Sequence, residues 1–310
     1  MGDLRGKDIL TAEQFSKEEV WLILQTAEAL EGELKKKRSL DVLPGYLLAT
    51  LFFEPSTRTR LSFEAAMHRL GGHVISVAEA KTASSAAKGE SLADTARTVE
   101  QYCDLIVIRH PQIGSAQEVA KAASIPVINA GDGAGQHPTQ ALLDLYTIWK
   151  ECGRLEDLTV ALVGDLKNGR TVHSLSTLLS LFGIRMIFVS PPTLAMPPDI
   201  TEGLRARGVD IAESEDLAAT ALESDVLYVT RIQRERFEDL TEYERLKGSY
   251  VVDNSLVQRF REGAVVMHPL PRVDEIAPEV DSYSGAAYFR QVRNGLYIRM
   301  ALLSLVLGKA

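Results

Sequence analysis

The chain has 310 residues, of which 45% are hydrophobic and 25% are charged, so a soluble protein of about two domains is expected. Lys and Arg total 34 against 42 Asp and Glu, a formal net charge of −8, which argues against nucleic-acid binding but not against a local cationic pocket. Two cysteines, Cys103 and Cys152, are too few for a disulfide framework or a zinc site, and we interpret them as small buried thiols.

No segment of the sequence has the pattern of a membrane or export signal. The N-terminal residues lack the apolar stretch of a signal peptide, and the longest apolar run, residues 300–308, is about half of a membrane span. We therefore expect a cytoplasmic protein without a membrane partner.

Short apolar runs alternate with helical patterns along the chain. Strands are expected at residues 47–53, 105–108, 127–128, 160–163, 186–189, 226–229, 250–252 and 265–267. Helical patterns include residues 57–70, 136–150, 171–182 and 288–307. Continuous apolar runs are typical of strands buried in a parallel sheet. The alternation predicts an α/β fold of two domains, each an open and mostly parallel sheet flanked by helices, with the active site in the cleft between them.

The first chemical motif, residues 54–60, joins an expected strand to an expected helix. Ser56 is a candidate N-cap, and the first helical turn offers unpaired N–H groups and the positive end of the helix dipole. Arg58 and Arg60 add guanidinium groups, each of which can bind two phosphate oxygens at once. Cations at a helix N-terminus oppose the dipole, so this arrangement favours a bound anion. The alternative is a capped surface helix with solvated arginines.

Two further motifs follow in the same half of the chain. Arg109 comes directly after a strand, where parallel sheets gather their ligands. His137 opens a helix, and Gln140 lies one turn later on the same side. His137 can donate a hydrogen bond to a developing oxyanion. The alternative is that it makes only a structural contact at the start of its helix. The small polar segment 81–90, which holds Ser84 and Lys88, reads by itself as a mobile loop.

The second half of the chain repeats the strand–loop pattern. Arg170 begins a helix after a glycine-containing loop that lacks the G-x-G-x-x-G pattern, so a nicotinamide enzyme is not expected. Arg231 and Gln233 alternate in an extended segment and can clamp a carboxylate. Pro269 and Pro271 remove two backbone donors and leave carbonyls that can accept from an N–H₂ group, while His268 is interpreted as structural.

In combination these motifs resemble the aspartate/ornithine carbamoyltransferase family over almost the full chain. The resemblance rests on Ser56-Thr57-Arg58-Thr59-Arg60, His137-Pro138-Thr139-Gln140 and His268-Pro269-Leu270-Pro271. Ornithine enzymes typically carry a Cys in the last motif (H-C-L-P), whereas this chain has His268-Pro269-Leu270-Pro271 there. That difference and Arg231-Ile232-Gln233 favour the catalytic chain of the aspartate branch.

The resemblance implies which residues act. The residues implied to bind carbamoyl phosphate are Ser56, Thr57, Arg58, Thr59, Arg109, His137, Gln140, Pro269 and Leu270. The implied catalytic residues are Arg58, Thr59, Arg109 and His137. The residues implied to bind aspartate are Lys88, Arg170, Arg231 and Gln233. Ser84 and Lys88 resemble a loop supplied by a neighbouring subunit, which implies a homotrimer with shared active sites.

The family likeness also implies domain limits and a reaction. Residues 1–136 form the carbamoyl-phosphate domain, rejoined by the terminal helix 288–310, and residues 137–287 form the aspartate domain. The carbamoyl group passes from carbamoyl phosphate to the α-amine of L-aspartate, as in pyrimidine biosynthesis, with no cofactor and no metal. The identity of the proton acceptor stays open, as does binding to a regulatory chain or another pathway enzyme. Alternatives are a carbamoyltransferase for another amine, a non-catalytic homologue and a phosphate-binding protein.

Overall fold

The computed structural model describes residues 3–83, 88–237 and 239–310 and divides into two compact units. Unit 1 comprises Met1–Leu143 and Arg293–Ala310, and unit 2 comprises Asp144–Val292. Both divisions fall inside helices, because α6 (Pro138–Cys152) and α12 (Tyr288–Val306) each continue from one unit into the other. No helix in the described part of the chain is long and apolar enough to cross a bilayer.

Unit 1 is built on a four-stranded parallel sheet in the order β2-β1-β3-β4. Its strands are β1 (Leu47–Phe52), β2 (His73–Ala78), β3 (Leu105–His110) and β4 (Val127–Asp132). Its other elements are α1 (Lys17–Lys36), α2 (Thr57–Arg69), α3 (Ala80–Ala83), α4 (Leu92–Val99), η2 (Glu100–Tyr102) and α5 (Ser115–Ala122).

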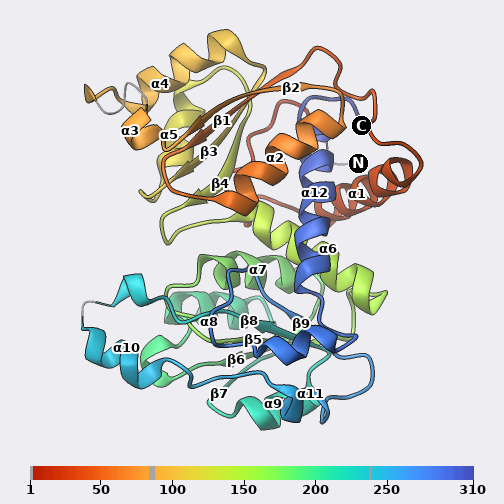
Figure 1. The fold of residues 1–310 in the computed structure, drawn as a ribbon, viewed down its shortest axis with the longest axis vertical. Helices are drawn as coiled ribbons and strands as arrows, with labels where there is room; N and C mark the ends of the chain where they lie inside the picture. Colours follow the sequence, from red (N-terminus) through yellow and green to blue (C-terminus); the bar gives the residue numbers. More distant parts are fainter. Residues whose placement is uncertain (1–2, 84–87, 238) are drawn as a thin grey trace. The chain divides into compact units, whose positions relative to one another are not determined.

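Helices cover both faces of this sheet (Figure 1). On one face, Ala96 of α4 and Val119 of α5 pack against Leu51 and Ile106 in a buried apolar cluster. The other face carries α2, and α12 lies on the same side (Figure 1). The backbone N–H of Gly6 donates to the carbonyl of Val306 at 2.8 Å, so the start of the chain is bonded to the end of α12. Burial on both faces explains why β1 and β3 are continuous apolar runs.

Unit 2 contains a five-stranded parallel sheet in the order β7-β6-β5-β8-β9. Its strands are β5 (Thr159–Val163), β6 (Arg185–Val189), β7 (Ile211–Ser214), β8 (Val226–Val229) and β9 (Val265–Met267). The remaining elements are α7 (Arg170–Ser180), η3 (Pro192–Leu194), α8 (Pro198–Ala206), α9 (Leu217–Glu223), η4 (Arg234–Arg236), α10 (Leu240–Leu246), α11 (Asn254–Val257) and η5 (Pro278–Ser282). Figure 1 shows α7 and α8 on one side of the sheet and α9 and α11 on the other.

The expected α/β class with parallel sheets is confirmed, but three strand assignments need correction. Residues 250–252 form no strand: Val252 makes a single bridge to Ile276, and Asp253 then caps α11. The strands β2 and β7 were missed because each has partly exposed side chains of mixed polarity at one edge of its sheet. The other edge strands, β4 and β9, are buried and were recognised, so exposure and not edge position alone removes the apolar signal.

Candidate functional site

In each sheet the strand order reverses at one point, and the motif residues follow the strands on either side of it. In unit 1 the chain proceeds from β1 outward to β2 and then returns to β3 on the other side of β1. In unit 2 it proceeds from β5 to β6 and β7 and then returns to β8. Ligands of open α/β sheets bind at the carboxyl ends of strands at such reversals. The topology therefore points to the loops after β1, β3, β5 and β8.

The loop after β1 leads into the N-terminus of α2. Ser56 occupies the N-cap position, but its hydroxyl makes no capping hydrogen bond, and the first turn contains no acidic residue. Thr57 and Arg58 are exposed, whereas Thr59 is buried. The helix thus presents N–H groups, hydroxyls and a guanidinium without a carboxylate in its first turn, which is the composition of an anion site.

Arg109, near the end of β3, lies directly beside the loop after β1. It is in register with Phe52, and the Phe53 N–H donates to its carbonyl oxygen at 2.8 Å. Its Nε lies 3.3 Å from Glu54 Oε2 in an ion pair. Burial lowers the pKa of the Arg109 guanidinium, the Glu54 charge opposes that change, and the nearby positive charge of Arg58 adds to it. The positive charges of Arg58 and Arg109 thus disfavour each other, and a bound dianion would offset that effect.

Arg60, which the sequence analysis grouped with Arg58, is held by neighbours within unit 1. Its Nη1 lies 3.1 Å from Glu64 Oε1, one turn later on α2, and 3.4 Å from the hydroxyl of Ser76 on β2. Arg60 therefore makes a structural contact that links α2 to the edge strand. Only the tertiary contact with Ser76 separates the roles of the two arginines.

The loop after β4 places His137 and Gln140. Asp132 Oδ1 accepts from the Gln136 N–H at 2.7 Å, and its Oδ2 accepts from the Gly114 N–H at 2.9 Å, so this buried carboxylate braces two loops. His137 is buried just before α6, and its carbonyl accepts from the Gln140 N–H at 3.0 Å. His137 and Gln140 are three residues apart, about one helical turn, as their spacing predicts.

In unit 2 the loops after β5 and β8 are in contact. Val163 is in register with Val229, and a Cβ on Gly164 would lie 2.2 Å from the carbonyl oxygen of Thr230, so only glycine fits there. Gln233 Nε2 donates to the carbonyl of Asn168 at 3.2 Å. Arg170 begins α7 immediately after this loop. The structure thus brings the segments of Arg170, Arg231 and Gln233 to one edge of the second sheet.

A buried carboxylate that the sequence analysis left without a role organises these loops. Asp165 accepts hydrogen bonds from the backbone N–H of Asn168 at 3.0 Å and from its side-chain amide at 3.1 Å. Burial raises the pKa of the Asp165 carboxyl, and the Asn168 and Gln233 backbone bonds partly oppose that change. The signal that could have found it is an aspartate directly after a buried strand.

The remaining candidate residues are placed as follows. Pro269 and Leu270 follow β9 and are partly exposed, with Leu270 in the left-handed region at a φ of 57°. Lys88 is exposed, and Ser84 lies outside the described residues. His110, which we interpret as structural, accepts from the Gln112 N–H at 3.1 Å and packs edge-on against Phe53.

Comparison with known protein families decides the relationship. Residues 7–150 match the model described as "Aspartate/ornithine carbamoyltransferase, carbamoyl-P binding domain", and residues 156–306 match "Aspartate/ornithine carbamoyltransferase, Asp/Orn binding domain". The chain belongs to the aspartate/ornithine carbamoyltransferase family. The first match ends within α6 and the second starts before β5.

Individual members of this carbamoyltransferase family align along the whole chain. An aspartate carbamoyltransferase catalytic subunit from Thermococcus gammatolerans is 58% identical over 306 residues, covering 99% of both chains. A chloroplastic aspartate carbamoyltransferase from Arabidopsis thaliana is 54% identical and covers 97% of this chain and 77% of the relative. The crystal structure of aspartate transcarbamoylase from Trypanosoma cruzi in complex with carbamoyl phosphate and aspartate superimposes with a TM-score of 0.93 at 44% identity, covering 98% of each chain.

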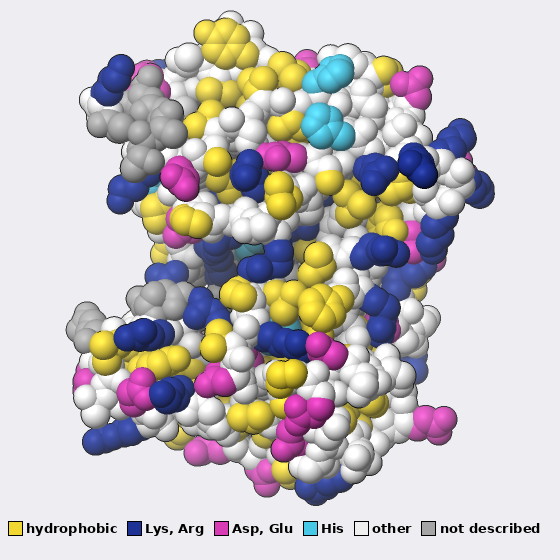
Figure 2. Space-filling view, in the orientation of Figure 1, with side chains coloured by type: hydrophobic (Ala, Val, Ile, Leu, Met, Phe, Trp, Pro, Cys, Tyr) yellow, Lys and Arg dark blue, Asp and Glu magenta, His cyan; other side chains and the backbone are white. Residues whose placement is uncertain are grey.

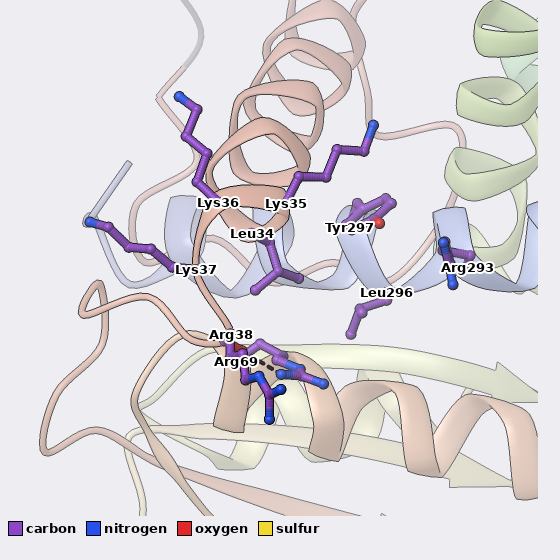
Figure 3. Close-up of a pocket in the computed structure, with 9 residues that line it drawn as sticks. All are labelled: Leu34, Lys35, Lys36, Lys37, Arg38, Arg69, Arg293, Leu296 and Tyr297. Atoms are coloured by element: carbon purple, nitrogen blue, oxygen red, sulfur yellow. Dashed lines mark hydrogen bonds between the residues drawn. The ribbon is translucent and has the colours of Figure 1, made fainter.

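A recess on unit 1 is separate from every carbamoyltransferase motif. It encloses about 390 Å³ between the end of α1 and α12, and Figure 2 shows Lys and Arg side chains gathered in the region of α1. Figure 3 shows Leu34 and Leu296 pointing toward Arg38 and Arg69, whereas Lys35, Lys36 and Lys37 extend away. No candidate site residue lines this recess, so its shape is no guide to the family's chemistry.

Proposed function

We propose that the chain is an aspartate carbamoyltransferase, which transfers the carbamoyl group of carbamoyl phosphate to the α-amine of L-aspartate and releases phosphate and N-carbamoyl-L-aspartate. Full-length relatives of that name, and a structural neighbour solved with carbamoyl phosphate and aspartate, support the assignment. The observation that carries it is the position of Arg109 at the end of β3, in register with the end of β1, whose following loop presents Arg58 in a first helical turn without an acidic residue.

Carbamoyl phosphate is proposed to bind to unit 1 through its phosphate. Ser56, Thr57 and Thr59 offer hydroxyls, and the first turn of α2 offers N–H groups. Arg58 and Arg109 supply two cations, which balance the roughly two negative charges of the ligand. Thr59, Arg109 and His137 polarise the carbonyl oxygen, and Gln140 accepts from the carbamoyl amide. Arg109 lies near the end of β3, and the other groups follow β1 or β4.

Aspartate is proposed to bind through its carboxylates to Arg170 and Arg231, with Gln233 as an amide partner. The Gln233–Asn168 bond supports this set because it connects the two loops that carry the arginines. A bidentate arginine suits a planar carboxylate, whereas a cationic ornithine would need an acidic partner. The carbonyls of Pro269 and Leu270 complete the acceptors of the carbamoyl amide.

The chemistry requires no protein nucleophile. The neutral α-amine attacks the carbamoyl carbon, a tetrahedral oxyanion forms, and phosphate leaves. Positioning of the two reactants can lower the activation barrier by roughly 7–11 kcal/mol. Donors aimed at the oxyanion from Thr59, Arg109 and His137 stabilise charge only as it develops, which is why they lower the barrier. The departing phosphate is a chemically competent acceptor for the amine proton.

Three finer features belong to the same proposal. The functional domains are residues 1–136 with 288–310 for carbamoyl phosphate and residues 137–287 for aspartate. Lys88 and Ser84 act in the active site of a neighbouring chain, so the enzyme is a homotrimer. The protein works in the cytoplasm, in the pyrimidine pathway to which carbamoyl aspartate belongs. The exposed position of Lys88 is compatible with a contribution to another subunit.

One assay tests the activity directly. The purified protein is given carbamoyl phosphate with a panel of amino acids, and carbamoylated product and phosphate are measured in parallel. We expect equimolar N-carbamoyl-aspartate and phosphate with aspartate and little turnover with ornithine. A preference for ornithine would assign the other branch of the family. Binding of carbamoyl phosphate without any product would identify a phosphate-binding protein or a non-catalytic homologue.

A further inference from the structure

The ring of His268 connects two parts of the loop after β9. It is buried, and both ring nitrogens have hydrogen-bond partners. Nε2 lies 2.6 Å from Glu275 Oε1, and Nδ1 accepts from the Leu270 N–H at 2.8 Å. Because Nδ1 accepts a hydrogen bond from the Leu270 N–H, it carries no proton. The ring proton is therefore on Nε2, where it faces the Glu275 carboxylate. Glu275 therefore sets the tautomer that allows His268 to hold the Leu270 backbone.

Glu275 is itself held in place. Its Oε2 accepts from the backbone N–H groups of Val273 and Asp274, each at 3.1 Å, and the side chain is buried. Burial raises the pKa of the Glu275 carboxyl, but the His268 hydrogen bond and the backbone donors outweigh it, so the net pKa lies below its ordinary value. The group is thus a fixed, ionised acceptor with both oxygens in use.

The residue that this chain of bonds reaches is strained. Leu270 has a φ of 57°, which a leucine adopts at a cost unless its surroundings impose it. The start of the loop is anchored independently, since the His268 N–H donates to Gln291 Oε1 at 3.0 Å and Gln291 in turn donates to Asp144 Oδ1 at 2.6 Å. His268 is thus fixed at its backbone and at both ring nitrogens, immediately before the two carbonyls in question.

We propose that Glu275, acting through His268, is a positioning residue that aims the Pro269 and Leu270 carbonyls at the amide of carbamoyl phosphate. The inference rests on the proposed function of this loop. It assigns a purpose to a buried acid that lies outside every motif by which the family is recognised. Strain held at a ligand-binding backbone, with neighbours that over-determine it, is the pattern expected of a preorganised acceptor.

Acetyl phosphate is the probe that isolates this role. It shares the phosphate and the carbonyl of carbamoyl phosphate but carries a methyl in place of the amide. The ratio of the dissociation constants of acetyl phosphate and carbamoyl phosphate therefore reports the amide acceptors alone. Glu275→Gln keeps the side-chain shape but offers an N–H₂ group where a second acceptor is needed. We expect the ratio to fall about tenfold, the effect of one or two lost hydrogen bonds, while acetyl phosphate binding is retained.

Two sets of variants keep the result interpretable. Asp274→Asn removes the same charge from the exposed neighbouring residue and should leave the ratio unchanged. His268→Asn retains a polar atom near the position of Nδ1, and His268→Gln retains one near Nε2. If Leu270 is the target, His268→Asn keeps more of the discrimination than His268→Gln. This comparison tests the His268–Leu270 contact through which Glu275 is proposed to act, even if Glu275→Gln fails to fold, and equal discrimination in the two His268 variants would overturn the proposal.

The outcomes distinguish a failure of the positioning role of Glu275 from a failure of the proposed carbamoyltransferase activity. An active wild-type enzyme with unchanged discrimination in Glu275→Gln would overturn the positioning role alone. An equal loss of affinity for both phosphates in that variant would show a general structural defect and also overturn it. A wild-type protein that makes no carbamoyl-aspartate would contradict the proposed function and this inference with it.

Discussion

Gln233 donates a hydrogen bond from Nε2 to the carbonyl oxygen of Asn168 at 3.2 Å, and the contact joins the loops after β8 and β5. Arg231 stands two residues before Gln233, and Arg170 stands two residues after Asn168. The bond therefore couples the positions of two cations that are far apart in sequence. It also holds in place an extended segment with little regular structure.

Loss of Arg231 should chiefly impair the use of aspartate. We expect Arg231→Ala to lower kcat/KM for aspartate by about 10²-fold, since truncation of one partner of a charge pair costs about 2–5 kcal/mol. The dissociation constant of carbamoyl phosphate should change little. Arg234→Ala is the matched control, because Arg234 is exposed on the adjacent turn η4. Steady-state kinetics in aspartate, with calorimetric binding of carbamoyl phosphate, measure both quantities, and equal defects in the two variants would refute the role.

The two arginines of the α2 motif should differ in their effects. Arg58→Ala is expected to lower kcat by at least about 10²-fold, the order found when a preorganised donor is lost. Arg60→Ala should retain most of the activity and instead reduce stability slightly, because Arg60 contacts Glu64 and Ser76. Turnover assays and thermal unfolding of both variants test the contrast. A near-normal kcat in Arg58→Ala would remove the central residue from the proposed mechanism.

Subunit sharing can be tested with two inactive variants. Lys88→Ala and Arg58→Ala chains are each expected to be inactive, yet mixed trimers should regain activity. If each site takes Arg58 from one chain and Lys88 from its neighbour, random assembly at equal concentrations restores about one quarter of the sites. The activity of chains unfolded together and refolded gives the result, with separately refolded chains as the reference. No recovery after demonstrated exchange would argue for self-contained sites.

The two cysteines should react slowly in the native protein. Both thiols are half-buried, and burial raises the pKa of Cys103 and of Cys152 to about 11. A raised pKa leaves less reactive thiolate, so at pH 8 alkylation should be about 100-fold slower than in the unfolded chain. Iodoacetamide labelling followed by mass spectrometry, with and without guanidinium, measures the difference. Fast native labelling at either position would show that the thiol is exposed in solution.

Much of the chain's organisation was predictable from the sequence. The buried strands β1, β3, β5 and β8 are apolar runs with turn residues on either side, because a strand covered on both faces must be apolar throughout. The α/β alternation follows from the spacing of those runs. The motif residues were identified by their chemistry and by their place after a strand. The edge strands β2 and β7 escaped because one exposed side relaxes that requirement.

By itself, then, the sequence determined the class of fold, the family and the residue types available for two anionic ligands, since these depend on composition and local pattern. The tertiary structure decided which of these groups are committed to other contacts. It paired Arg60 with Glu64 and Ser76, connected Gln233 to Asn168, and placed Glu275 behind His268. Such contacts join residues on different strands and loops, and their distances depend on how the sheet is ordered and packed, which no local pattern encodes.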